Sequence, residues 1–186
     1  HNDTSSADGG ADGQTGQGAD GTPLGPEDAV QQEEETLEGL MSVDAIAIEL
    51  GVDLIALVDE TKGGNLVERI SRIRRQIVQE MGLIVPSVTL RDNLRLDGGE
   101  YRILLRGEEI GRGRVVPRQH LAINPGDADE GLHGLSTIDP VFGLEALWII
   151  DKNKLDAQAK GYTVVDVPTV VTTHLTEILN QYGHEL

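Results

Sequence analysis

Two long stretches of the chain carry apolar residues at helical spacing. In the first, Asn65 stands where a helix cap is expected, Glu68 follows three residues later, and Gly82 marks an end. The apolar positions between them recur every three or four residues and share one face. They are Leu66, Ile70, Ile73, Ile77 and Met81. The pattern predicts an amphipathic helix over residues 66–81.

The second helical stretch lies near the C-terminus. Pro168 stands where the first turn of a helix tolerates proline. The apolar positions that follow it at helical spacing are Val170, Val171, Leu175, Ile178, Leu179 and Tyr182. Such a helix needs a partner for its apolar face. It could return to pack on the first part of the chain, which would make residues 118–166 an insertion.

Shorter apolar segments indicate strands. Residues 46–50 alternate between large apolar and other side chains before Gly51, and residues 85–93 follow the first helix as a second strand. Residues 101–107 and 108–116 lie back to back around Gly107 and Glu108, which favours a hairpin. The first part of the chain therefore mixes helix and strand.

A second, smaller unit is expected after Pro117. Residues 120–126, 143–150 and 162–166 are compatible with strands. The polar segment 151–161 between the last two predicts a short helix closed by Gly161. The fold class predicted for the whole chain is thus a mixed α/β architecture.

Charge separates the beginning of the chain from the rest. The net charge is −17; residues 1–40 contain ten acidic and no basic residues, so the remainder carries 22 acids against 15 bases, a net −7. The acidic stretch has too little apolar surface to offset the entropy of folding. We expect residues 1–41 to be a disordered acidic linker. The net negative charge of the remainder argues against general binding of nucleic acid.

Several classes of protein are excluded or disfavoured by composition. The chain has no cysteine, so disulfides, thiolate metal sites and cysteine nucleophiles are excluded. No apolar run reaches the ~18 residues that a membrane-spanning helix requires. Because the sequence begins at His1 and not at Met, we expect a piece of a longer protein.

Candidate chemistry in the residues is sparse. The five histidines show no metal-binding spacing, and no carboxylate pair is tied by spacing to a nucleophile. Residues 62–65, KGGN, could hold an anion before the first helix, but they lack the ending of a phosphate loop, so a turn is favoured. Neither an enzyme, a metal site nor a cofactor is predicted.

Four arginines on the first predicted helix are a candidate binding surface. They could meet nucleic acid or an acidic partner, although a solvated helix face is the usual role of such residues. These residues are Arg69, Arg72, Arg74 and Arg75.

Phe142 is the only phenylalanine of the chain and follows an Asp-Pro turn signal at Asp139 and Pro140. The ring could remain near the surface as a binding anchor, or it could belong to the core of the small second unit. The residues by themselves favour the core.

The order of several motifs indicates a family. LGVDLIALVDE, GGNLVERISRIRRQIVQEMG, VTLRDN, YRILLRGEEIGRG, LAINPG, IDPVFGLEALWI and GYTVVDVPTVVTTHL together resemble the FlhA-like (FHIPEP) family over residues 43–186. This family forms the large export-gate component of bacterial flagellar and type III secretion systems. The resemblance implies a membrane domain, an acidic linker and four cytoplasmic subdomains that assemble into a ring of nine, at the cytoplasmic face of the inner membrane. The GVDLIALVDE and IDPVFGL segments look more flagellar.

The resemblance implies a domain organisation. Residues 1–41 would be the linker. Residues 42–117 with 167–186 would form the first cytoplasmic subdomain, described in the family as thioredoxin-like, and residues 118–166 the inserted second one. The CxxC motif of thioredoxin chemistry is absent.

The resemblance also implies binding sites. Family members receive export chaperones with their late substrates in a shallow apolar depression marked by DPxFGL and VVxTHL motifs, which correspond here to Asp139, Pro140, Phe142 and Thr173. Phe142 would be the anchor, so the resemblance reverses the reading of it as core. Arg74 and Arg75 match a segment near the neighbouring subunit's third subdomain. Since that subdomain lies outside this chain, we expect a monomer.

The resemblance therefore implies a docking platform for export chaperones and for other subunits of the export apparatus. Two alternatives remain. One is a catalytic or nucleotide-handling α/β domain. The other is an element that acts mainly in ring assembly.

Overall fold

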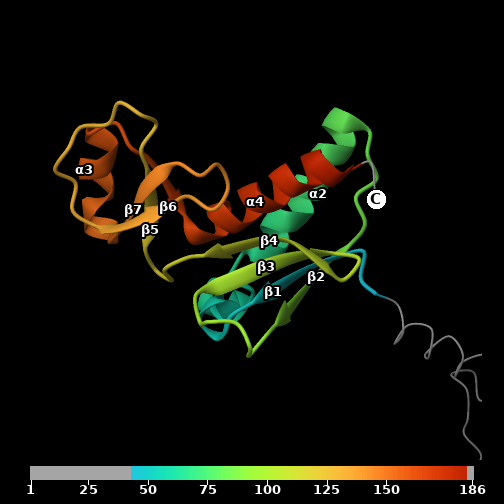
Figure 1. Ribbon diagram of the computed structural model, residues 1–186. Helices are drawn as coiled ribbons and strands as arrows, with labels where there is room; N and C mark the ends of the chain where they lie inside the picture. The colour runs from blue at the N-terminus through green and yellow to red at the C-terminus, as the bar shows by residue number, and fades with distance from the viewer. Residues whose placement is uncertain (1–42, 184–186) are drawn as a thin grey trace, which may run out of the picture. The chain divides into compact units, whose positions relative to one another are not determined.

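The computed structural model describes residues 43–183, shown in colour in Figure 1. The predicted acidic linker, residues 1–41, lies outside the described residues. The described part contains two four-stranded sheets and several helices, which confirms the predicted mixed α/β class.

The first sheet has the strand order β2-β1-β3-β4. Its central strand β1 (Ile46–Leu50) runs parallel to β2 (Val88–Asp92) and antiparallel to β3 (Glu100–Leu105), and β3 forms a hairpin with β4 (Glu108–Arg114). All four strands coincide with segments predicted as strands. The parallel pair requires a crossover, which the first long helix supplies.

The turn of the hairpin is displaced by one residue from the predicted position. Leu105 pairs with Glu108, so the two turn residues are Arg106 and Gly107, with φ angles of 49° and 86°. Positive φ at both positions is typical of the type I′ turn that matches the twist of a hairpin. Glycine at Gly107 meets this requirement without a steric cost.

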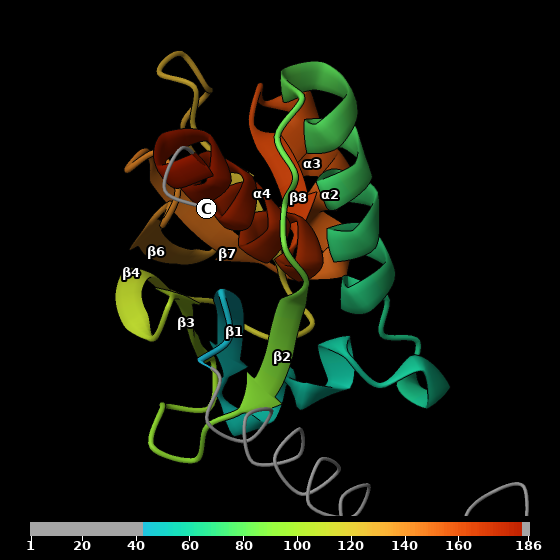
Figure 2. The same ribbon diagram turned by 90° about the vertical axis from the view of Figure 1, so that its right-hand side faces the viewer.

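The two long helices α2 (Leu66–Met81) and α4 (Val167–Tyr182) lie side by side on one face of the first sheet (Figures 1 and 2). The core between them and the sheet includes Tyr101, which is fully buried. Gly113 on β4 makes room for this ring, because a Cβ there would lie 2.5 Å from the Tyr101 Cζ and Oη atoms. The returning helix thus packs as the sequence pattern suggested.

The second sheet has the strand order β6-β7-β5-β8 and is antiparallel throughout. Three of its strands match predicted segments: β5 (His120–Ile123), β7 (Glu145–Ile149) and β8 (Thr163–Asp166). The edge strand β6 (Leu135–Ile138) was not predicted, because four residues with two hydroxyl side chains give no clear alternation.

The two faces of the second sheet pack against different partners. On one face, Ala122 and Ile149 contact Ala157 of the short helix α3 (Lys154–Ala159), which follows a 3-10 turn η3 (Asp151–Asn153). On the other face, Leu121, Ala146 and Trp148 join the main core. The domain boundaries at residues 117 and 167 remain a proposal.

The segment between β1 and α2 differs from the prediction. It forms two 3-10 helices, η1 (Val52–Leu57) and η2 (Glu60–Lys62), that the sequence did not indicate. Asn65 precedes α2, but its side chain makes no capping hydrogen bond and instead accepts one from the Arg69 Nε atom at 3.0 Å. The predicted capping box is therefore wrong. Gly82 does end the helix, with φ 66°.

The start of α4 is held by Asp166, the residue before the helix. Its carboxylate accepts a hydrogen bond from the Thr169 backbone N–H at 2.9 Å and forms an ion pair with Arg69 of α2 at 2.8 Å. Burial tends to raise the pKa of Asp166, but the hydrogen bonds from Thr169 and the charge of Arg69 outweigh it and hold the pKa below its ordinary value.

Asp166→Ala is expected to lower the free energy of unfolding by about 1–2 kcal/mol at pH 7, because it removes a helix cap and an interhelical ion pair. A depressed pKa stabilises the fold above the unfolded pKa of ~3.9 and stops doing so as the pH falls through the folded value. The loss should therefore shrink below about pH 4. Urea unfolding from pH 7 to 3 measures it, and Glu68→Ala, which removes an exposed pair with Arg72, is the control.

Candidate functional site

The predicted docking motif forms the turn between β6 and β7. Asp139 holds both ends of this turn: its backbone N–H donates to the Leu144 carbonyl at 2.8 Å, and its carbonyl accepts from Gly143 N–H at 3.0 Å. Its Oδ2 atom accepts a further hydrogen bond from the Phe142 backbone N–H at 2.6 Å. Gly143 adopts φ 71°, a conformation that favours glycine. The Asp139 side chain thereby fixes the backbone that carries Phe142.

The Phe142 side chain is 57% exposed. The core role that the residues by themselves favoured is therefore wrong. Two further apolar residues of the same hairpin are exposed beside it in sequence, Ile138 and Leu144. Most exposed apolar residues need no explanation, but a run within one hairpin is a candidate contact surface.

Asp139 itself is only 2% exposed. Its side chain has almost no surface to offer to a partner, so its role in a docking site would be to position Phe142. Pro140 is half-buried in the same turn. The sequence could not separate a contacting aspartate from a supporting one, because both are compatible with an Asp-Pro turn.

A buried polar cluster connects this turn with α4 and the first sheet. The Tyr101 hydroxyl and the His174 Nδ1 atom are 2.8 Å apart, and the two rings meet edge to face at 5.7 Å. Burial raises the pKa of Tyr101, and the nearby Asp139 carboxylate raises it further. Burial lowers the pKa of His174, while Asp139 opposes that effect. This cluster was not predicted, because its members are distant along the chain.

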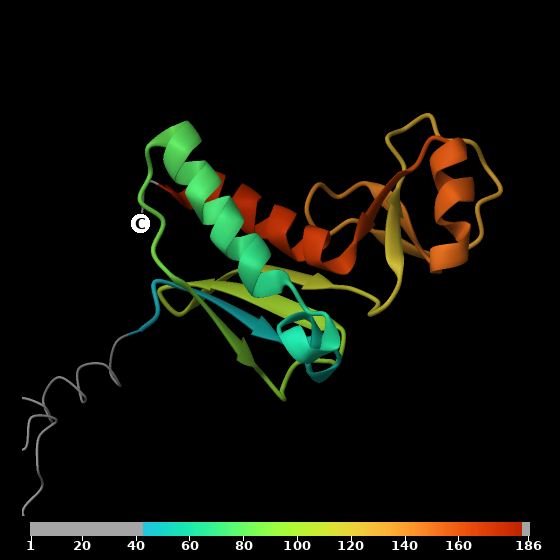
Figure 3. The same cartoon turned by 180° about the vertical axis from the view of Figure 1, so that it is seen from behind.

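Thr173 precedes His174 on α4 and is half-buried. Its neighbour Thr172 is buried and donates a hydrogen bond to the Pro168 carbonyl at 2.9 Å, whereas the Thr173 hydroxyl has no hydrogen bond within residues 43–183. The β6–β7 turn lies next to α4 in Figures 1 and 3, which is consistent with the effect of the Asp139 carboxylate on the pKa of His174.

Three of the four arginines on α2 are held by contacts within the chain. Arg69 pairs with Asp166 and Arg72 with Glu68. Arg74 donates from Nη2 to the Val85 carbonyl at 2.9 Å, while its buried Nε atom has no hydrogen-bond partner among the described residues.

Arg75 is exposed and forms no hydrogen bond or ion pair with any described residue. Of the two predicted subunit-contact residues, Arg75 is therefore the one with a free guanidinium. Arg74 is engaged within its own chain.

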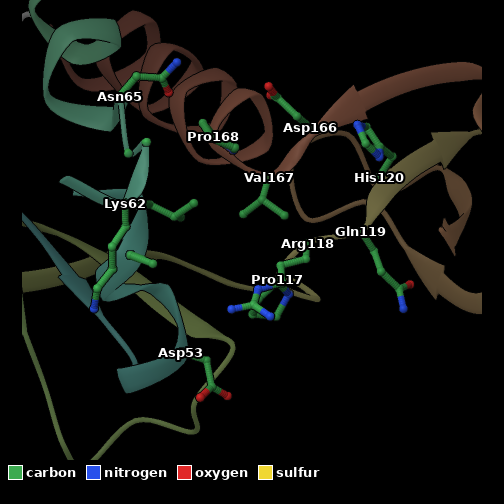
Figure 4. A pocket seen from close by; sticks show the side chains of 14 residues that line it. Asp53, Lys62, Asn65, Pro117, Arg118, Gln119, His120, Asp166, Val167 and Pro168 are labelled. Carbon is green, nitrogen blue, oxygen red and sulfur yellow. The ribbon is translucent and has the colours of Figure 1, made fainter. Parts of the chain in front are cut away.

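A separate cavity of about 430 Å³ lies where the KGGN segment, the Pro117–His120 connection and the start of α4 meet (Figure 4). Gly63 ends η2 with φ 78°, and the Gly64 N–H donates to the Asp59 carbonyl at 2.9 Å. A Cβ at Gly64 would lie 2.4 Å from the Ala56 carbonyl oxygen, so close backbone packing requires glycine there. The two glycines thus serve the turn that the sequence favoured.

Two of the charged groups around this cavity each lie near an opposite charge. Lys62 lies 3.7 Å from Asp59, and His120 Nδ1 lies 3.8 Å from Asp151. Within the part of the chain that the structure describes, no group of three or more acidic or histidine side chains could hold a metal ion. Neither 16-residue helix among residues 43–183 has the length and apolar character needed to cross a membrane.

Comparison with known proteins decides the family. The model of the FHIPEP family matches residues 12–186. The chain belongs to the FHIPEP family. A relative within it, the flagellar biosynthesis protein FlhA of Escherichia coli, is 46% identical over 153 residues, which are 82% of this chain. The chain spans 22% of the length of that FHIPEP relative.

Solved structures support the fold. The Chlamydia pneumoniae CdsV protein superimposes with a TM-score of 0.63 at 24% identity, over 77% of this chain and 42% of that one. Nonameric SctV-C from EPEC aligns with a TM-score of 0.51 at 13% identity, over 78% of this chain and 42% of that one. At this level of identity the two structures show a shared fold. The predicted family is thus confirmed on sequence, and its fold on structure.

Proposed function

We propose that the chain is part of the export gate of a bacterial flagellar or type III secretion system and acts without catalysis as a docking platform. Export chaperones carrying late substrates would bind at the β6–β7 turn through Phe142, with Thr173 at the edge of the contact and Asp139 and Pro140 as turn supports. The observation that carries the proposal is the exposed Phe142 ring on a turn fixed by a buried carboxylate. Aromatic anchors of this kind dominate the energetics of many interfaces.

The proposed location follows from the family. We place the whole protein at the bacterial inner membrane, with residues 43–183 on its cytoplasmic side, next to other subunits of the export apparatus. Residues 42–117 with 167–186 and residues 118–166 would be its first two cytoplasmic subdomains, preceded by the acidic linker.

Calorimetric titration with purified export chaperones bound to their late substrates tests the docking role. Saturable binding that depends on Phe142 is expected. Titration with nucleotides and divalent metal ions tests the alternative of a catalytic or nucleotide-handling domain, for which the 430 Å³ cavity beside Lys62 would be the site. Saturable micromolar binding of either would favour that alternative.

Residues 1–186 by themselves are expected to be mainly monomeric. A ring of nine, as in the solved SctV-C, requires contacts between neighbouring subunits. In the proposed arrangement, Arg74 and Arg75 face a neighbour's third subdomain, which this chain does not include. Multi-angle light scattering should give a mass near the 20.0 kDa of one chain. A stable nonamer would contradict both the monomer and the proposed role of these arginines.

A further inference from the structure

The two sheets of the described residues have four edge strands, and one of these edge strands is unprotected. The free edges belong to β2, β4, β6 and β8. An edge strand exposes unpaired backbone groups, and proteins commonly protect it with charges, proline or a bulge. β2 ends in Arg91 and Asp92, β8 ends in Asp166, and β4 carries four charged residues and a register shift. β6, with the sequence LSTI, has none of these.

The hydrogen-bonding pattern shows which backbone groups of β6 face outward. The Asp139 N–H donates to Leu144, so this opposed pair is hydrogen-bonded. Antiparallel pairing alternates, so Leu135 and Thr137 also direct their backbone groups to β7, and Ser136 and Ile138 direct theirs to the open side. Glu145 lies opposite Ile138 and directs its backbone to β5: its carbonyl accepts a hydrogen bond at 2.9 Å from the N–H of Asn124, the residue that follows β5.

The side chains of β6 add apolar surface to this edge. Leu135 is 62% exposed and Ile138 is 59% exposed, and alternation along the strand places them on opposite faces of the sheet. The Ile138 carbonyl is 3.5 Å from the Thr137 hydroxyl, a contact at the limit of hydrogen bonding. The edge therefore presents both backbone donors and acceptors and an apolar side chain at each end.

We propose that β6 pairs with an extended segment of the partner that docks on the Phe142 turn. The segment adds a strand to the second sheet beyond β6. It has about four residues without proline at the paired positions, and apolar side chains that meet Leu135 and Ile138. Backbone hydrogen bonds give affinity in strand addition, and the alternating side chains give selectivity. This inference rests on the proposed docking function.

The size of the edge argues for a different protein and against a second copy of this chain. Four residues span roughly 14 Å at ~3.4 Å each. Two copies paired through β6 would bury far less than the ~800 Å² per partner of a stable interface. The same short pairing is sufficient as one part of a larger contact, and Phe142 lies only four residues beyond the end of β6.

Ser136→Pro tests the pairing. Proline removes the outward N–H and keeps the bonds of Leu135 and Thr137 to β7, a position that edge strands tolerate. Ser136→Ala is the matched control, because it removes the hydroxyl and keeps the N–H. With a purified export chaperone–late substrate complex as the probe, Ser136→Pro should weaken binding about tenfold and Ser136→Ala should not. In the wild type, the amide hydrogens of Ser136 and Ile138 should exchange more slowly when the probe is bound.

The outcomes separate the two proposals. Unchanged affinity in a folded Ser136→Pro variant, or unchanged amide exchange at Ser136 and Ile138, overturns strand pairing; a loss of affinity in Phe142→Ala would still support docking at the turn. If the wild type binds no probe, both proposals fail. A wild-type dimer in light scattering that Ser136→Pro abolishes would assign the edge to self-association and overturn pairing with the partner. The exchange measurement needs no variant, so it decides the question even if Ser136→Pro does not fold.

Discussion

Phe142→Ala is expected to weaken binding of an export chaperone–substrate complex by about 2 kcal/mol, roughly 30-fold, while the fold is retained. The reason is the position of the ring, which is 57% exposed on a turn that is fixed by backbone hydrogen bonds and by the Asp139 carboxylate, which accepts one from the Phe142 N–H. A buried phenylalanine would instead cost ~3–5 kcal/mol of stability on truncation. Titration calorimetry and urea unfolding of the same variant separate the two effects.

The control for this variant is Leu155→Ala. Leu155 is an exposed apolar residue on α3, outside the proposed docking turn. Its truncation should leave the affinity unchanged. Wild-type affinity in a folded Phe142→Ala variant would remove Phe142 from the site.

Two companion variants distinguish contact from support. Thr173→Ala removes a half-buried hydroxyl that makes no hydrogen bond within residues 43–183, so binding should fall and stability should change little. Asp139→Ala should lower both, because its buried carboxylate holds the Phe142 backbone. A loss of binding in Asp139→Ala without a loss of stability would mean that Asp139 touches the partner directly.

Trp148→Ala is expected to lower the free energy of unfolding by about 3–5 kcal/mol, the range for large aromatic residues in a core. Trp148 is 3% exposed and belongs to the cluster that joins the second sheet to α4 and the first sheet. Urea unfolding followed by circular dichroism measures the change, because the variant has no tryptophan fluorescence.

Leu155→Ala again serves as the control, since a residue that is 78% exposed should cost less than ~0.5 kcal/mol. A loss below ~1 kcal/mol in Trp148→Ala would contradict the packing. It would mean that the second sheet is not part of the same cooperative core.

The sequence predicted the elements whose signals are local. Helix α2 (Leu66–Met81) and its end at Gly82 follow from spacing and from a left-handed C-terminal glycine, and α4 (Val167–Tyr182) carries its proline in the first turn. Strand β1 follows from its alternating apolar residues before Gly51, and β3 and β4 follow from the hairpin pattern around Gly107. Each of these signals acts within a few residues, so it can be recognised in a single sequence.

Other features depended on residues far apart in the sequence. The apolar face predicted for α2 included Met81, which is 47% exposed and does not belong to the main core. Asn65 has a cap-forming side chain, but Arg69 occupies its oxygen. Strand β6 forms by pairing with β7. Its four residues mix polar and apolar side chains without clear alternation, so the sequence did not predict a strand there.

The candidate site divides in the same way. The motifs located Asp139, Phe142 and Thr173 through the family resemblance, and the Asp-Pro turn signal followed from the residues themselves. Only the tertiary structure decided that Asp139 is buried and Phe142 exposed, and that Tyr101 and His174 stand behind the turn. The physical reason is that burial is a property of the packed neighbours: β3, α4 and the β6–β7 turn must all be in place before the carboxylate is enclosed and the ring is left in solvent.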